Sequence, residues 1–475
     1  MKLEETLGDL TSALGEGGVV TAPDLLERYV VDQRDLIRGS TPAVLRPTTV
    51  EQVASIVRIA SAGGFGLVPH GGNTGYCGGA TPDCSGQQFV LSLERMNRIR
   101  EIDPLGFSIS VDAGAVLADA QSAAAAAGLM LPLSLGSEGS CRVGGNIATN
   151  AGGLSVLRYG MTRDLLLGIE AVLSDGSILS DMKGLRKNNT GYDVKQCFVG
   201  SDGTLGIITG AVLKLCPAPI QYATAWIQLA SGAPLPDMLG VARRETSDLL
   251  SAFEFVTPTS LELVRGLGHG SSTLRSGAGG ALIIELSASS ARVPLEEILL
   301  AALEILIERG WAEDAFIAQN DRQRQDIWKV RESIPEGEKR AGGSVKHDIS
   351  VPISAVSEYL ARGAEIVADY DPSLRLSIYG HVGDGNIHYN ILVPDGLERL
   401  AFSATIEADL SLRLYDLAES LNGTFSAEHG VGRLKRNLLE RYSDPVRLEL
   451  MRRIKRAFDP QALLNSGAVV APSRT

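Results

Sequence analysis

The sequence is short of basic residues, aromatic residues and long apolar runs, and each shortage excludes a class of protein. Lys and Arg number 44 against 56 Asp and Glu, for a formal net charge of −12, and aromatic residues make up 5% of the chain. Such a chain offers no basic surface to a phosphate backbone, so nucleic acid is not an expected partner. No stretch approaches the ~18 consecutive apolar residues of a membrane span, so any membrane contact is expected to be peripheral.

Cysteine is scarce as well, because the five residues are widely spaced and form no C-x-x-C pair. This spacing excludes a disulfide framework and does not favour a thiolate-bound zinc or iron–sulfur centre. A reducing, cytoplasmic location is therefore expected. The N-terminus is predicted to be an ordinary helix, because apolar residues recur there at helical spacing and acidic residues stand where a secretory signal needs an apolar stretch.

The 475 residues are enough for roughly three domains of ~150 residues. Short strand-like runs alternate with helical stretches between residues 43 and 218, for example the predicted helix at Val50 to Ala62 and the predicted strand at Phe89 to Leu91. Longer amphipathic helices, such as Pro294 to Arg309, follow. We predict an α+β fold in three parts: a first domain at residues 1–217, a second at 218–425, and a helical C-terminal segment at 426–475 that packs on the first domain.

Glycine, in contrast, is abundant, with 53 residues, and it is concentrated in loops. Eight of the seventeen residues from Gly63 to Gly79 are glycine, and similar loops follow at Gly136 to Gly153 and at Gly200 to Gly206. Closely spaced glycines expose backbone N–H groups and remove Cβ atoms, so the chain can wrap a pyrophosphate. The first loop matches neither G-x-G-x-x-G nor a P-loop, which argues against a nicotinamide Rossmann site and a kinase-type nucleotide site.

Three such loops, each beside an apolar segment, indicate one long ligand laid across a domain edge. Together they resemble the FAD-binding domain of the vanillyl-alcohol oxidase / p-cresol methylhydroxylase superfamily, over about residues 43 to 217. The resemblance implies an FAD-binding domain of two subdomains, followed by an α+β substrate (cap) domain. His70 stands where many relatives carry Arg, and Asn73 stands where covalently flavinylated branches carry the linking His, so noncovalent FAD is expected.

The same resemblance implies a set of flavin contacts from the glycine loops, the segments beside them and the C-terminus. They are Pro69, His70, Gly71, Gly72, Asn73, Thr74, Gly75, Gly78, Gly79, Pro132, Gly136, Gly139, Ser140, Cys141, Gly144, Gly145, Asn146, Thr149, Asn150, Gly152, Gly153, Tyr159, Gly160, Gly203, Gly206, Ile208 and Asn465.

Three of the six histidines fall in two short motifs in the last quarter of the chain. The first motif is predicted to be a hairpin with a loop at residues 383–386, so that His381 pairs directly with His388. Opposed side chains share a face with Cβ atoms ~5 Å apart, which lets two imidazoles converge on one ion. Glu428, in the second motif, would complete a two-His-one-carboxylate set typical of catalytic zinc, although manganese or iron(II) accept the same ligands.

Both motifs, with Val330 to Pro335 and Val345 to Pro352, resemble a branch of the same superfamily that contains D-2-hydroxyglutarate dehydrogenases, D-lactate dehydrogenases and the glycolate oxidase large subunit. This resemblance covers nearly the whole chain. It implies three groups of site residues: the metal ligands His381, His388 and Glu428, the base His429, and the substrate contacts Arg331, Lys346 and Asn390. Pro335 stands where the 2-hydroxyglutarate enzymes tend to carry Thr, so strict 2-hydroxyglutarate specificity is not expected.

These residue types suit the oxidation of an alcohol. A metal ion and a neutral imidazole both assist the loss of a hydroxyl proton, Arg and Lys bind carboxylates, and flavin accepts hydride. Together with the resemblance, which alone supplies the D configuration, these residues predict FAD- and zinc-dependent oxidation of a D-2-hydroxy acid, such as D-2-hydroxyglutarate or D-lactate, to the 2-oxo acid. Electrons would leave to a separate quinone, cytochrome or electron-transfer flavoprotein, and a homodimer is the default oligomer.

Two other functions stay open at this point. A non-catalytic flavoprotein subunit that only passes electrons has no need of a metal and a base, so the intact histidine set argues against it. A metal-dependent hydrolase or lyase that holds a nucleotide in the glycine loops would be colourless. The remaining histidines considered, His347 and His269, are interpreted as structural.

Overall fold

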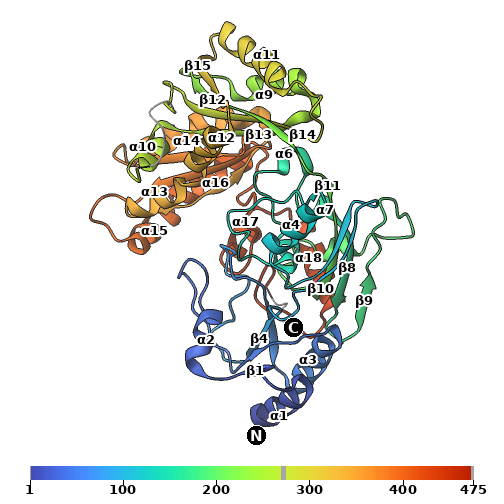
Figure 1. Ribbon diagram of the computed structural model, residues 1–475. Coiled ribbons are helices and arrows are strands. Elements are labelled where there is room, and N and C mark those ends of the chain that lie inside the picture. The colour runs from blue at the N-terminus through green and yellow to red at the C-terminus, as the bar shows by residue number, and fades with distance from the viewer. Residues whose placement is uncertain (1, 269–273, 472–475) are drawn as a thin grey trace. The chain divides into compact units, whose positions relative to one another are not determined.

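A computed structural model describes residues 2–268 and 274–471 of the chain (Figure 1). His269 therefore lies outside the described residues. The chain divides into two compact units. The first combines Met1–Gly152, Tyr159–Ala218 and Glu428–Thr475, and the second combines Gly153–Arg158 and Pro219–Ala427. Helices and strands occur in both units, which confirms the predicted α+β class.

The first unit contains two larger sheets that share one apolar core. The first sheet has the strand order β1-β2-β4-β3, and β2, β4 and β3 pair in parallel; its strands are β1 (Val19–Val20), β2 (Val44–Leu45), β3 (Gly66–His70) and β4 (Gln88–Ser92). The second sheet is antiparallel in the order β5-β6-β10-β8-β9; its strands are β5 (Ile99–Asp103), β6 (Ser108–Asp112), β8 (Leu166–Val172), β9 (Ile178–Asp181) and β10 (Ile207–Lys214).

Helix α3 (Val50–Gly63) shows how local sequence sets an element of this unit. Thr49 caps its N-terminus by accepting a hydrogen bond from the Gln52 N–H, and Gly64 ends it in the left-handed conformation, with φ of 77°. The structure confirms the predicted helix at 50–62, and the predicted strand at 89–91, to within one residue at each end. The other longer helices of the unit are α1 (Lys2–Leu14), α2 (Pro23–Val30), α4 (Leu117–Ala126) and α18 (Pro445–Phe458).

The second unit is built on one antiparallel sheet of eight described strands. The order is β15-β12-β14-β13-β18-β19-β16, and β17 also pairs with β19. The strands are β12 (Gln221–Leu229), β13 (Leu250–Val256), β14 (Gly280–Ala288), β15 (Ala312–Ile317), β16 (Ser344–Val345), β17 (Asp348–Ser350), β18 (Leu376–Gly380) and β19 (Asn386–Leu392). Every residue of β14 is buried, because helices cover both faces of the sheet.

The two faces of this sheet carry different helices and different chemistry. On one face lie α10 (Pro258–Arg265), α12 (Asp321–Glu332) and α13 (Ile334–Arg340), whose apolar residues share a core with Tyr379 of β18. On the other lie α9 (Leu235–Thr246), α11 (Leu295–Glu308), α14 (Val356–Tyr370) and α16 (Leu410–Ser420), and there Tyr359 packs against Tyr389 of β19. Because side chains alternate along a strand, His388 and Asn390 point toward the α12 and α13 face.

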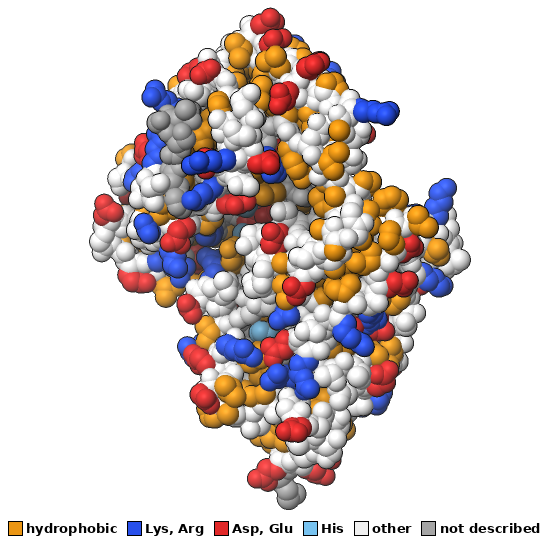
Figure 2. All heavy atoms as spheres, in the orientation of Figure 1, with side chains coloured by type: hydrophobic (Ala, Val, Ile, Leu, Met, Phe, Trp, Pro, Cys, Tyr) orange, Lys and Arg blue, Asp and Glu red, His pale blue; other side chains and the backbone are white. Residues whose placement is uncertain are grey.

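His347 is buried between β16 and β17, and both of its ring nitrogens have partners. Nδ1 lies 2.9 Å from the carbonyl oxygen of Tyr389, and Nε2 lies 2.8 Å from Ser411 Oγ. These contacts fit the structural role that was predicted for His347. Among the described residues, no helix has the length and hydropathy to cross a membrane. Acidic and basic side chains are interspersed on the face of the molecule shown in Figure 2.

Candidate active site

The glycine loops and the C-terminal Asn465 meet in the first unit. Gly72 lies so close to the second loop that a Cβ there would stand 2.2 Å from the carbonyl oxygen of Ser140. Asn465 Nδ2 donates hydrogen bonds to the carbonyl oxygens of Gly79 and Asp202, at 2.7 Å each. Loops that are far apart in the sequence therefore form one structure, which we call the cradle.

Some glycines of the cradle face open space. A Cβ built there would meet no atom of the described residues within 4 Å; these positions are Gly75, Gly136, Gly139 and Gly145. Gly144 and Gly206 differ, because a Cβ at either would lie within 2.7 Å of a neighbouring side chain, so glycine is needed there for packing. The open positions leave exposed backbone and room for a ligand, which fits the pyrophosphate and ribityl chain of FAD.

His70 is buried at the end of β3. Its Nδ1 lies 3.1 Å from the carbonyl oxygen of Gly71, and its Nε2 has no hydrogen-bond partner among the described residues. Burial lowers the pKa of His70 to about 4, so the ring is neutral at pH 7 and its lone pair lies on Nε2. A buried acceptor without a partner fits a site that a bound group completes.

Asn73 stands where covalently flavinylated relatives carry the linking His, and in this structure its side chain has a structural role. Its backbone is in the left-handed region, with φ of 53°, and its Nδ2 donates a hydrogen bond to the carbonyl oxygen of Val31 at 2.8 Å. The side chain is therefore committed to the fold and, as an amide, has no nucleophilic nitrogen. Both observations fit noncovalent FAD.

The remaining predicted flavin contacts lie in or beside the same loops. Thr149 and Asn150 end the short helix α5 (Val143–Thr149), and Ile208 is buried in β10. Cys141 is buried, and burial raises the pKa of its thiol, so it is not a reactive thiolate. Gly153 is the one predicted contact that falls in the second unit.

His429, the predicted base, belongs to the first unit. Its ring contacts Tyr76 edge to face, with centroids 4.7 Å apart. The N–H of Gly432, three residues later, donates to Asp202 Oδ2 at 3.0 Å, and burial raises the pKa of Asp202 to about 6. The loop that carries His429 is thus attached to the first and third glycine loops, beside the cradle.

The hairpin that carries His381 and His388 differs from the predicted register. Strands β18 and β19 pair Tyr379 with His388, so the predicted pairing of His381 with His388 is wrong by two residues. His381 lies instead in the connection between the strands. Gly380 gives the reason, because a Cβ there would lie 2.6 Å from the carbonyl oxygen of Asn386; only glycine lets the chain turn back this early.

The two imidazoles nevertheless converge. The ring centroids of His381 and His388 are 5.4 Å apart, with the rings at 81° to each other. Glu254 Oε1 lies 2.6 Å from His381 Nδ1, and Glu254 Oε2 accepts a hydrogen bond from Arg331 Nε at 2.8 Å. Burial alone would raise the pKa of Glu254, but its interactions with His381 and Arg331 outweigh burial, so that pKa is lowered.

This contact decides which nitrogen of His381 can bind a metal. The ionised carboxylate of Glu254 only accepts hydrogen bonds, so the proton of His381 is on Nδ1 and the lone pair of the neutral ring is on Nε2. A carboxylate that orients an imidazole in this way is a usual partner of metal-binding histidines. The donor types and the tautomer therefore fit a divalent metal.

Arg331, Asn390 and Lys346 extend the same polar network. The guanidinium of Arg331 lies 4.7 Å from the centroid of the Tyr379 ring. Asn390 Nδ2 and Lys346 Nζ donate to Glu338 at 2.9 and 3.0 Å. All of these residues belong to the second unit, so this unit alone brings the three predicted substrate contacts beside the two histidines.

Sequence reasoning missed Glu254 and Glu338. Glu254 interrupts the apolar run from Ala252 to Val256, and a single carboxylate inside a buried strand requires a cationic partner, which was a usable signal. Glu338 lies in the polar sequence of α13 and had no comparable signal.

Glu428 follows directly after Ala427, the last residue of the second unit. The N–H of Ala427 donates to the carbonyl oxygen of Asp348 at 3.2 Å, and Asp348 stands directly opposite His388 in the ladder of β17 and β19. Consecutive Cα atoms are ~3.8 Å apart, so Glu428 starts next to the strands that carry His388.

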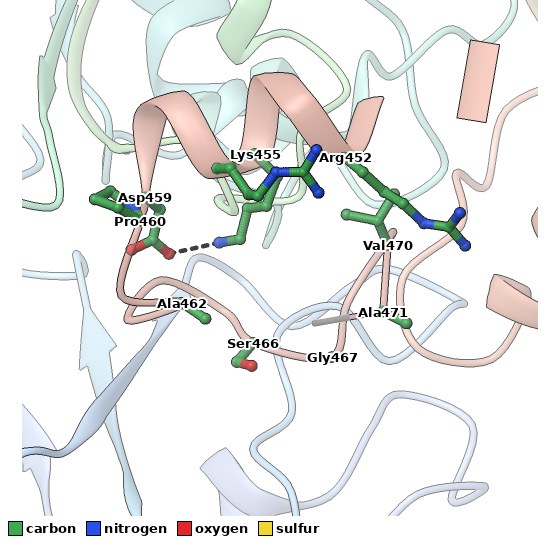
Figure 3. Close-up of a pocket in the computed structure, with 10 residues that line it drawn as sticks. Arg452, Lys455, Asp459, Pro460, Ala462, Ser466, Gly467, Val470 and Ala471 are labelled. Carbon is green, nitrogen blue, oxygen red and sulfur yellow. Dashed lines mark hydrogen bonds and ion pairs between the residues drawn. The ribbon is translucent and has the colours of Figure 1, made fainter. Parts of the chain in front are cut away.

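A pocket lies beside α18 in the first unit (Figure 3). Its lining includes none of the predicted site residues. Lys455 points at Asp459, and its ammonium also donates to the carbonyl oxygens of Thr204 and Leu464. A lysine with three acceptors holds the C-terminal segment in place, which is a structural role.

Comparisons with known proteins agree with this geometry. Residues 41–181 match the family described as FAD binding domain, and residues 237–469 match the family described as FAD linked oxidases, C-terminal domain. The chain is 36% identical over 450 residues to D-2-hydroxyglutarate dehydrogenase, mitochondrial, of Bos taurus, which covers 94% of this chain and 80% of the relative. It is 35% identical over 467 residues to D-2-hydroxyglutarate dehydrogenase of Stutzerimonas stutzeri, which covers 98% of both.

Solved structures share the fold at lower identity. p-Cresol methylhydroxylase with substrate bound has a TM-score of 0.76 and 19% identity, over 99% of this chain and 97% of that one. A 4-ethylphenol oxidase from Gulosibacter chungangensis, in complex with isoeugenol, has a TM-score of 0.75 and 18% identity, over 100% and 98%. These likenesses confirm the fold that the glycine loops led us to expect.

Proposed function

This chain belongs to the FAD-linked oxidase family that contains the D-2-hydroxyglutarate dehydrogenases and is an FAD-dependent oxidoreductase, and we propose that it oxidises a D-2-hydroxy acid with the help of a divalent metal. D-2-Hydroxyglutarate, D-lactate and related acids are the candidate substrates, and the 2-oxo acid is the product. The observation that carries the proposal is the polar network of the second unit, where His381 and His388 converge beside Arg331.

The cradle of the first unit is the proposed binding site of noncovalent FAD. When bound, FAD supplies the hydride acceptor. Open backbone at Gly75, Gly139 and Gly145 would approach the pyrophosphate and ribityl chain without hindrance from a side chain. The neutral His70 would offer its Nε2 as an acceptor at the edge of the cradle.

The proposed metal ligands are His381, His388 and Glu428, and zinc is the expected ion. Two imidazoles and one carboxylate leave a position for substrate, as in catalytic zinc sites. When bound, such an ion lowers the pKa of the substrate hydroxyl. Glu254 fixes the ring of His381 with Nε2 as the donor atom, so the ligand is oriented before an ion arrives.

The remaining roles belong to side chains of this protein. His429 takes the proton of the substrate hydroxyl, and its contact with Tyr76 keeps the imidazole beside the cradle. Arg331 uses one N–H for Glu254 and binds the C1 carboxylate with the others, since guanidinium matches the planar shape of a carboxylate. Held at both the hydroxyl and the carboxylate, the substrate has its C2 hydrogen free to leave as hydride.

The test is an anaerobic titration of the purified protein with D-lactate, L-lactate, D-2-hydroxyglutarate and D-mandelate, followed by the flavin absorbance. We expect a D-acid to bleach the flavin, a chelator to abolish the bleaching and zinc to restore it. A protein with a flavin spectrum that no acid bleaches would overturn the proposal and favour an electron-transfer subunit. A protein without flavin would favour the hydrolase or lyase.

Two variants separate the proposed roles of the histidines. H388A is expected to lose zinc and turnover together, because it removes a ligand. H429N is expected to retain both flavin and zinc but to lose turnover by at least about a hundredfold, since it removes only the base. Normal turnover in H429N would exclude His429 as the base. Because the chain has no iron–sulfur cysteines, we propose that a separate quinone, cytochrome or electron-transfer flavoprotein reoxidises the flavin.

A further inference from the structure

Helix α18 has one face that packs on the first unit and one face that does not. The packed face carries Leu448, which is buried, and Phe458, whose ring contacts Phe198 edge to face at a centroid distance of 5.8 Å. Lys455 belongs to the same face, where its ammonium donates to three acceptors. The helix is therefore fixed in the fold, and its outer face is presented as a rigid surface.

The outer face of α18 exposes a row of three aliphatic side chains. Val446, Leu450 and Ile454 are 68%, 51% and 41% exposed. They are spaced four residues apart, so they lie one above the other over ~12 Å of the helix. Single exposed apolar residues are ordinary on protein surfaces, but a continuous row on one face of one helix indicates a contact with an apolar environment. We call this row the α18 stripe.

Arginines border the α18 stripe on both sides. At ~100° per residue, Arg447 falls on one side of the stripe, and Arg453 and Arg456 fall on the other. The side chains of Arg453 and Arg456 are 68% and 46% exposed, and both donate to Glu449, the one carboxylate of the helix, at 3.0 Å. The helix carries five Lys and Arg in total, so its net charge is +4 in a chain whose net charge is −12. The stripe therefore lies in a basic region of an acidic protein.

We propose that α18 docks this protein on the surface of a lipid bilayer that contains anionic lipids. Aliphatic side chains between flexible cations are typical of a helix that lies in the membrane interface, with its apolar row among the acyl chains and its arginines at the headgroups. Each Lys or Arg near such a surface strengthens binding about fivefold. The negative charges elsewhere on the chain weaken this attraction little, because physiological salt screens charges beyond ~8 Å.

The composition of this face favours lipid over an acidic protein as the partner. Protein interfaces concentrate their binding energy in Trp, Tyr and Arg at a packed centre, whereas the centre of the α18 stripe is wholly aliphatic. A stable protein contact also needs ~800 Å² on each partner, which is more than three partly exposed aliphatic side chains supply, but a single helix suffices for an interfacial contact. Docking would bring the protein to a lipid-soluble acceptor and so favours a quinone among the proposed acceptors. The inference goes beyond the proposed function and does not depend on it.

The experiment is co-sedimentation of the protein, as purified, with lipid vesicles. We expect the protein to bind vesicles of equal amounts of phosphatidylcholine and phosphatidylglycerol, and not to bind vesicles of phosphatidylcholine alone. Salt at about 1 M, which shortens the screening length to ~3 Å, should release the protein. Mixed vesicles that do not bind the protein, or vesicles of phosphatidylcholine alone that bind it equally well, would overturn the proposal.

Two variants test the apolar and the charged parts of the contact separately. V446S/L450S/I454S removes the aliphatic row, and R447Q/R453Q removes two of the bordering charges; each should lower the vesicle partition coefficient by at least about tenfold. All five residues are exposed, so both variants should keep the wild-type denaturation temperature and flavin absorbance. If one variant does not fold, the other still decides. Unchanged binding in a folded variant would overturn the proposal.

L300S/I307S provides a matched control. Leu300 and Ile307 lie on one face of α11 in the second unit and are 47% and 44% exposed, but α11 contains four Glu and no Lys or Arg. This variant should bind mixed vesicles as the wild type does, and a loss as large as that in V446S/L450S/I454S would overturn the assignment to α18. If the wild type binds no vesicles and the triple variant dissociates a dimer in sedimentation velocity, the proposal is wrong and the stripe is an interface between two copies.

Discussion

Replacing Glu254 with Gln is expected to lower both the free energy of unfolding and the affinity of the proposed metal site for zinc. Glu254 is 1% exposed and faces two donors, His381 Nδ1 at 2.6 Å and Arg331 Nε at 2.8 Å. A Gln of the same shape has one acceptor oxygen and one NH2 group, so it satisfies both neighbours only if its NH2 faces His381 and the ring proton moves from Nδ1 to Nε2. The variant therefore exchanges the ionised acceptor of Arg331 for a neutral one, at a cost of about 1.5–3 kcal/mol, and leaves Arg331 without its counter-charge. In total, the free energy of unfolding should fall by about 3–5 kcal/mol.

The same change should weaken zinc binding, because the tautomer of His381 is no longer fixed. Loss of such a partner typically costs about 10–100-fold in metal affinity. The assay is competition for zinc with a chromophoric chelator, with thermal denaturation of the same samples. E285Q is the control: Thr224, Arg324 and Trp328 donate to the buried Glu285, so this variant also breaks a buried network and is expected to lower the denaturation temperature but keep its zinc affinity. Zinc binding in E254Q as tight as in the wild type would refute this account of the site.

Three further outcomes are expected. G72A should lower both the stability of the apoprotein and the affinity for FAD, since its Cβ would lie 2.2 Å from the carbonyl oxygen of Ser140. G145A, whose Cβ meets open space, should lower only the affinity for FAD. If the two variants lowered apoprotein stability equally, the proposed FAD site in the cradle would be contradicted. Burial raises the pKa of Asp202 to about 6 from 3.8, so the unfolded chain releases this proton first and stability falls as the pH rises through that range. Above pH 6, the free energy of unfolding of D202N should therefore exceed that of the wild type by up to about 3 kcal/mol, with the gain fading toward pH 4; denaturation measured across this pH range checks it, and a pH-independent gain would exclude this cause. R331K should lower kcat/KM by at least about tenfold, since Lys has neither the planar fork nor the stacking on Tyr379, and unchanged kinetics would remove Arg331 from substrate binding.

Much of the fold and the general chemistry could be predicted from local sequence. Helix α3 was predictable because its cap, its apolar spacing and its terminal glycine all lie within a few residues of one another. The glycine loops were recognisable because glycine frees the backbone at its own position, whatever the rest of the chain does. The residue types of the histidine motifs pointed to a metal and a base for the same reason: donor chemistry belongs to the side chain itself.

The tertiary structure alone decided how these residues are held. The hairpin register depended on the close approach of Gly380 to Asn386, which strand periodicity does not reveal. Glu254 is 127 residues from His381 and 77 from Arg331, and Glu338 is 52 residues from Asn390. Pairing across such separations follows from strand order and helix packing, so no local pattern contains it. The sequence by itself thus determined which groups are available for flavin, metal and acid, whereas the fold determined their tautomers and their charge balance, because both depend on partners that are distant in the sequence.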